Sequence, residues 1–127
     1  MSLRSPLGRA RGLGSAKSGT QHWWAQRLTA IALVPLVVWF VIAMVAATGS
    51  DYASARTFIG NPITAVLMIL LIAATFHHAQ LGLQVVIEDY VHTKSTEIVL
   101  LLLVKGAAIV LVIAAIFAVL SIAFGGA

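Results

Sequence analysis

Three long apolar runs most constrain what this chain can fold into. Leu28–Ala47 contains no charged residue, and Ile63–Ile87 contains no Asp, Glu, Lys or Arg. Ile98–Phe124 is interrupted only by Lys105. Each run reaches the roughly 20 apolar residues that cross a bilayer as a helix. The sequence therefore predicts an all-α fold, an integral membrane bundle of three transmembrane helices at about 28–47, 63–87 and 98–124.

Composition supports one membrane unit rather than several domains. The chain has 127 residues, of which 61% are hydrophobic and 9% charged. It has no cysteine, which excludes disulfides and Cys-ligated metal or iron–sulfur sites within this chain. Four of its eight basic residues lie before residue 18. That placement indicates membrane topology, and no nucleic-acid partner is expected.

The first 19 residues are rich in Gly, Ser and Arg, with one proline at Pro6. Such a segment buries little apolar area, so residues 1–19 are predicted to form a flexible basic N-terminal tail. Residues 20–127 are predicted to form the three-helix membrane anchor. The apolar run that follows is longer than the 7–15 residues typical of a secretory signal, which predicts that it is retained.

Two polar loops are predicted between the runs. Residues 48–62 form the first, and its Asn61-Pro62 pair is a plausible N-cap followed by proline in the first turn of a helix. Glu88–Glu97 forms the second, with Glu88 and Glu97 as solvated charges. Trp23 and Trp24 precede the first run, a position that suits the membrane interface.

Basic residues predict the orientation. Six lie in the tail, before the first run or in the second loop, and one, Arg56, lies in the first loop. The positive-inside rule then places the N-terminus in the cytoplasm of a bacterial cell, with the chain a multi-pass protein of the cell inner membrane. A mitochondrial inner membrane, with the N-terminus in the matrix, is the less favoured alternative. Lys105 is expected to extend toward the cytoplasmic headgroups.

The stretch HHAQLGLQVVIEDYVH, residues 77–92, carries the candidate functional residues. Ionisable side chains inside a membrane segment are costly, and they indicate functional sites. On a helix His78, Gly82 and Asp89 share one face, and Gly82 leaves room there for a flat, bulky group. Tyr90 lies about 18 Å from His78 along the axis, at ~1.5 Å per residue. His77 points about 100° away and is expected to make a different polar contact.

This pattern resembles the small, haem-binding D-type membrane-anchor subunits of succinate dehydrogenase. The matching positions are His78, Gly82, Asp89 and Tyr90, together with the three-run layout and the segment GTQHWWAQRLTA before the first run. The resemblance implies that His78 is an axial ligand of haem b, shared with a larger cytochrome b anchor subunit. It implies that Gly82 lies beside the haem.

The same resemblance assigns the remaining candidates. Arg27 and His22 would lie near the haem propionates, although a related sequence has its histidine where this chain has Gln21. Tyr90 would donate a hydrogen bond to ubiquinone, and Asp89 would orient partners or relay protons. The other partners implied are a flavoprotein subunit with FAD and an iron–sulfur subunit. The isolated chain would have no catalytic activity.

Other interpretations stay open at this stage. A fumarate reductase anchor or a menaquinone-linked relative has nearly the same sequence features. A structural or transport subunit without cofactor would use its histidines as interhelix hydrogen-bonding groups or a proton relay. Tyr90 would then be an ordinary interfacial aromatic residue.

Overall fold

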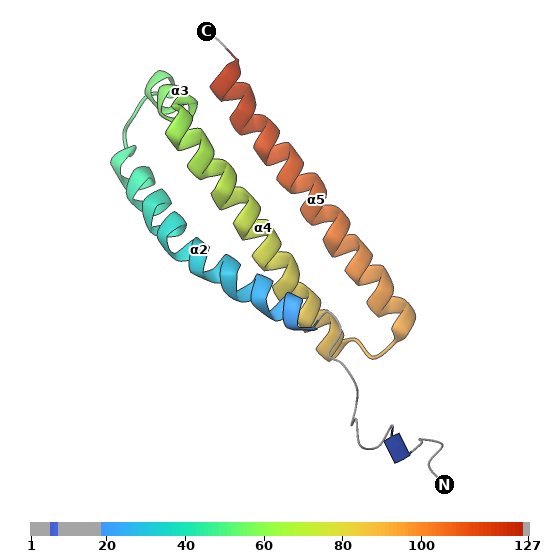
Figure 1. Cartoon of the computed structure of the whole chain (residues 1–127). Helices are drawn as coiled ribbons and strands as arrows, with labels where there is room; N and C mark the ends of the chain where they lie inside the picture. The colour runs from blue at the N-terminus through green and yellow to red at the C-terminus, as the bar shows by residue number, and fades with distance from the viewer. Residues whose placement is uncertain (1–5, 8–18, 126–127) are drawn as a thin grey trace.

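The computed structural model of the protein describes residues 6–7 and 19–125. The predicted flexible tail thus lies almost entirely outside the described residues. Residues 19–125 are mostly helical. Their helices are α2 (Gly19–Ala46), α3 (Tyr52–Gly60), α4 (Pro62–Tyr90) and α5 (Lys94–Phe124) (Figure 1).

The three helices long and apolar enough to cross a membrane are α2, α4 and α5. This confirms the predicted all-α, three-span architecture. Each helix begins before the apolar run that predicted it. α2, for example, begins at Gly19, because its interfacial polar and aromatic residues continue the helix of the apolar run. The run therefore marks the membrane-crossing part, and the helix includes its interfacial ends.

The helix α4 is the centre of the structure. Both α2 and α5 pack on α4, while within the described residues α2 and α5 do not contact each other (Figure 1). Most of the buried apolar side chains belong to α4, among them Leu71, Leu81 and Ile87. The spans therefore form an open layer, and apolar side chains are exposed on all three.

The predicted start of the second span is confirmed. The Asn61 side chain accepts hydrogen bonds from the backbone N–H of Ile63 at 3.0 Å and of Thr64 at 3.4 Å. Pro62 occupies the first turn, where its missing N–H costs nothing. Local cap chemistry thus fixes where α4 begins.

The first loop was predicted too simply, because residues 52–60 form the helix α3. Its N-cap is Asp51, whose carboxylate accepts from the Ser54 N–H at 2.8 Å. Hydrogen bonds from the Ser54 side chain and then its backbone N–H hold the pKa of Asp51 below its usual range. Arg56 Nη2 donates to the Gly125 carbonyl at 2.7 Å, which ties α3 to the end of α5.

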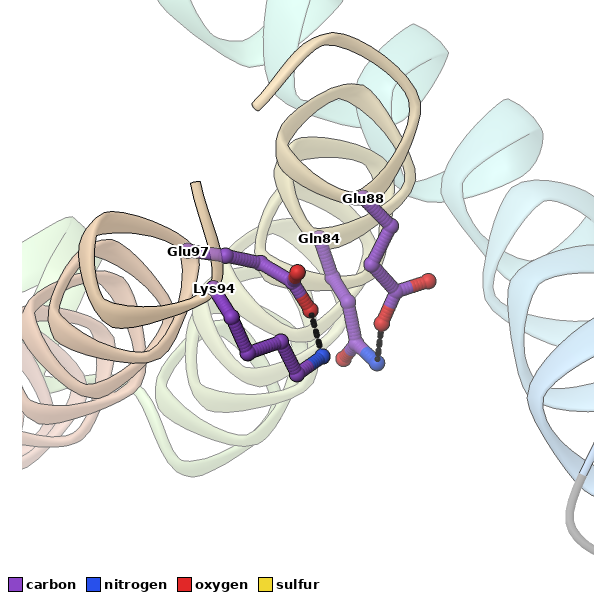
Figure 2. A network of polar contacts seen from close by, with 4 residues as sticks. All are labelled: Gln84, Glu88, Lys94 and Glu97. Carbon is purple, nitrogen blue, oxygen red and sulfur yellow. Dashed lines mark hydrogen bonds and ion pairs between the residues drawn. The ribbon is translucent and has the colours of Figure 1, made fainter. Parts of the chain in front are cut away.

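The second loop is also shorter than predicted. α4 continues to Tyr90 and α5 begins at Lys94, so residues 91–93 alone connect them. Figure 2 shows that the two predicted loop glutamates have partners: Gln84 Nε2 donates to Glu88 at 2.8 Å, and Lys94 Nζ donates to Glu97 at 2.6 Å. Glu97 lies in the first turn of α5, where the helix dipole favours an acidic side chain.

The ends of the layer follow the predicted alternation. The start of α2 lies at the same end as the connection between α4 and α5, and α3 lies at the other end, beside the end of α5 (Figure 1). This is the arrangement that three successive crossings produce.

Candidate functional site

The imidazole of His78 lies between α4 and α2, and it is half-buried. Its Nδ1 is 3.0 Å from the Thr29 hydroxyl oxygen. Its Nε2 is 3.5 Å from Gln26 Nε2, at the outer limit of a hydrogen bond. Both ring nitrogens of His78 therefore face polar atoms of the first span.

Three polar residues form one stripe on α2. His22, Gln26 and Thr29 are spaced four and three residues apart, which places them on one helix face. Within the described part of the chain, two atoms of this stripe are buried without a hydrogen-bond partner: His22 Nε2 and Gln26 Oε1. Buried polar atoms are normally paired, so these two are available to a group that lies outside the described residues.

Gly82 lies one turn beyond His78 and faces the same stripe. A Cβ at Gly82 would lie 3.7 Å from Gln26 Nε2 and would meet no other atom closely. The missing side chain at Gly82 thus leaves a gap, and the flexible Gln26 side chain borders it. The structure brings His78, Gly82, Gln26 and Thr29 together at one point of the α2–α4 contact.

His77 lies on another side of α4. It lines a groove of about 250 Å³ between α4 and α5, together with Phe76, Gln80, Ala108 and Ile109. No hydrogen bond of His77 occurs within the described residues, so its predicted polar contact stays a prediction. The predicted separation of the two histidine side chains agrees with this placement.

Arg27 lies outside the polar stripe. Its guanidinium is 5.4 Å from the centre of the Trp23 ring. Trp23 packs edge-to-face against Trp24, with ring centres 5.0 Å apart. These residues form an exposed aromatic and cationic cluster near the start of α2, as expected at a membrane interface. Of the two predicted propionate contacts, only His22 lies on the face that meets His78.

Asp89 and Tyr90 are the last two residues of α4, and both are exposed. Tyr90 is 78% exposed, so few atoms of this chain cover its side chain. His92 Nδ1 lies 3.1 Å from the Tyr90 carbonyl oxygen, to which it donates. Because α4 is one continuous helix from Pro62 to Tyr90, this pair lies about 16–18 Å from His78 along its axis, at ~1.5 Å per residue, as predicted.

Sequence reasoning missed Gln26 and Thr29 as parts of the site. The signal that could have found them is the spacing of His22, Gln26 and Thr29 in the sequence QHWWAQRLT. A polar stripe at four- and three-residue spacing next to an apolar run indicates a helix face that meets protein or cofactor, not lipid.

Comparisons with known proteins agree with the predicted family. The family described as succinate dehydrogenase/fumarate reductase transmembrane subunit matches residues 1–120. A succinate dehydrogenase hydrophobic membrane anchor subunit of Rickettsia bellii (strain RML369-C) is 36% identical over 117 residues, covering 92% of this chain and 94% of that protein.

Two further relatives come from other sources. The succinate dehydrogenase hydrophobic membrane anchor subunit of Paracoccus denitrificans is 35% identical over 86 residues, covering 68% of this chain and 67% of that protein. The succinate dehydrogenase membrane anchor subunit of Reclinomonas americana is 31% identical over 96 residues, covering 73% and 80%. The chain therefore belongs to the succinate dehydrogenase/fumarate reductase transmembrane subunit family, as a membrane anchor subunit.

Proposed function

We propose that this chain anchors the flavoprotein and iron–sulfur subunits of succinate dehydrogenase to a bacterial inner membrane and helps to build a haem b site and a ubiquinone site. Family membership supports the anchor role. The open layer supports assembly with another anchor subunit, because the exposed faces of α2, α4 and α5 leave room for partner helices. The observation that carries the cofactor proposal is the position of His78 against the polar stripe of α2.

The residues at this position fit a haem. His78 would hold the iron through one imidazole nitrogen, and the larger anchor subunit would supply a second ligand. Gly82 leaves space one turn away, and the contact between Gln26 and His78 is long enough to be displaced at small cost. When bound, a b-type haem supplies a one-electron redox centre.

Two residues, His22 and Arg27, are candidates to contact the haem propionates. His22 lies on the stripe facing His78, and its buried Nε2 has no partner among the described residues. It is the better placed donor to a carboxylate near His78. The Arg27 guanidinium lies over the Trp23 ring, outside the polar stripe that faces His78.

The quinone site is proposed at the end of α4. Reduction of ubiquinone to ubiquinol takes up two electrons and two protons, so the site needs contact with water and with hydrogen-bond donors. The exposed Tyr90 hydroxyl can donate to a quinone carbonyl, and the neighbouring Asp89 can accept and pass on a proton. The electrons would arrive from the iron–sulfur subunit, since this chain has no cysteine to hold a cluster.

A second candidate function has one observation in its favour. His78 already makes polar contacts with Thr29 and Gln26, which is how a histidine that only joins two helices would behave. In that case the chain is a structural anchor without haem.

Purification of the tagged chain from its native membrane separates these functions. We expect a flavoprotein, an iron–sulfur protein and a second helical anchor to co-purify, with succinate-dependent ubiquinone reduction and a b-type reduced-minus-oxidised spectrum. An active complex without that spectrum would favour the structural function. A stable chain that purifies alone would contradict the anchor proposal.

A further inference from the structure

We propose that Thr29 is a positioning residue that fixes the tautomer of His78, so that Nδ1 carries the proton and Nε2 is the free metal-binding nitrogen. This inference rests on the proposed haem-ligand role of His78. It concerns a contact between two spans that are 49 residues apart in sequence.

The proton of the Thr29 hydroxyl is already committed. Thr29 Oγ1 lies 2.7 Å from the Ala25 carbonyl oxygen and 3.1 Å from the Gln26 carbonyl oxygen. A carbonyl oxygen can only accept, so the hydroxyl must donate to this pair. The same oxygen therefore has no proton left for His78, and toward the imidazole it can only accept a hydrogen bond. The 3.0 Å contact is therefore a hydrogen bond in which His78 Nδ1–H donates to Thr29.

The other ring nitrogen agrees with this assignment. A neutral imidazole protonated on Nδ1 has an unprotonated Nε2. The group that faces Nε2 is the Gln26 amide nitrogen, which is a donor. Both contacts thus favour the same tautomer, in which the lone pair of Nε2 is the one that a metal would take.

The contact also sets how strongly His78 donates electrons. A ligating histidine is oriented by the hydrogen bond of its second nitrogen, and that bond raises the basicity of the ligand. Thr29 is held by the backbone of its own helix, so its oxygen is a fixed acceptor. Stronger donation from Nε2 stabilises oxidised iron more than reduced iron. Thr29 therefore lowers the midpoint potential of the bound haem.

The test compares three variants in the assembled complex. Thr29→Val keeps the branched shape and removes the acceptor, while Thr29→Ser keeps the hydroxyl. Thr57→Val is the matched control, because Thr57 donates to a helix carbonyl in the same way, at 2.9 Å, but lies on α3. We expect Thr29→Val to raise the haem midpoint potential and to change the low-spin EPR signal. Thr29→Ser and Thr57→Val should match wild type.

The outcomes separate this inference from the proposed function. Equal potentials and EPR signals in wild type and Thr29→Val, with haem lost in His78→Ala, would overturn the role of Thr29 and leave the haem site standing. A complex without haem, or one whose haem is unchanged in His78→Ala, would overturn both. Where Thr29→Val does not assemble, Thr29→Ala removes the same acceptor with less bulk, and a wild-type potential in that variant overturns the inference equally.

Discussion

His77 and His78 are neighbours in sequence but lie on different sides of α4. His78 contacts Thr29 and Gln26 of α2, whereas His77 lines the groove toward α5. The angle of about 100° between successive residues of a helix produces this separation. Substitution of one histidine therefore probes one helix contact without disturbing the other.

The first prediction concerns these two histidines. His78→Ala should abolish or strongly perturb the b-type haem spectrum of the purified complex, because it removes the proposed axial ligand. His77→Ala should retain the spectrum. The measurement is the reduced-minus-oxidised absorbance per flavin, which corrects for differences in yield. Equal spectra in the His78 variant and wild type would reject the ligand assignment.

The second prediction concerns the space at Gly82. A Cβ there makes an ordinary contact 3.7 Å from Gln26 Nε2, so Gly82→Ala should assemble with nearly normal haem content. Gly82→Leu should lose most of the haem, since its branched side chain fills the space next to His78. Gly106→Leu on α5 is the control, because nothing lies within 4 Å of a Cβ at that position. Full haem content in Gly82→Leu would show that the cofactor does not need this space.

The third prediction concerns Tyr90. Tyr90→Phe should lower succinate-dependent ubiquinone reduction by roughly two- to thirteenfold, since a neutral hydrogen bond contributes about 0.5–1.5 kcal/mol. Succinate oxidation with an artificial acceptor and the haem spectrum should be spared. Tyr52→Phe is the control, as Tyr52 is equally exposed but begins α3 at the other end of the layer. Unchanged quinone reduction and inhibitor sensitivity in Tyr90→Phe would assign the donor to another residue.

The sequence predicted those parts of the fold that depend on local signals. Apolar length identified the three spans, and the Asn61-Pro62 pair identified the start of α4. The helix α3 was missed because it is short and lies in a polar segment, although Asp51 three residues before Ser54 is a readable N-cap signal.

Residue spacing predicted the candidate site only along α4, and His22 of α2 was suggested by the family resemblance alone. The relation of His78 to Gly82 and Tyr90 follows from spacing on one helix. Its contacts with Gln26 and Thr29 depend on how far α2 slides along α4 and how it is rotated. That register comes from side-chain packing between helices, which single-helix periodicity does not contain.

The fourth prediction concerns the pH dependence of α3. The pKa of Asp51 is lowered in the folded chain, so its cap stabilises the helix above the ordinary carboxyl pKa and loses that effect as the pH falls through the lowered value. Hydrogen exchange of Tyr52–Gly60 should therefore speed up in this acidic range relative to the intrinsic rate. Asp51→Asn should keep the cap and remove the pH dependence. The same pH profile in Asp51→Asn and wild type would contradict the role of the carboxylate.

The fifth prediction concerns orientation. A reporter fused after residue 127 should be periplasmic, and one inserted in the 91–93 turn should be cytoplasmic, given the excess of basic residues at that end. Arg56 is the one basic residue of the first loop, so adding lysines beside it is a control that should weaken the bias. A cytoplasmic C-terminal reporter in the unmodified chain would contradict the three-span topology.

The open layer also bears on how a cell regulates the amount of this chain. α2 is held through α4 alone among the described spans, and few side chains are buried. An unassembled copy thus opens at low cost, which exposes it to membrane proteases. Partner helices that cover the layer bind the folded form, and by mass action they raise the free energy needed to open it. The steady-state level of the chain then follows the supply of its partner subunits more closely than its own rate of synthesis.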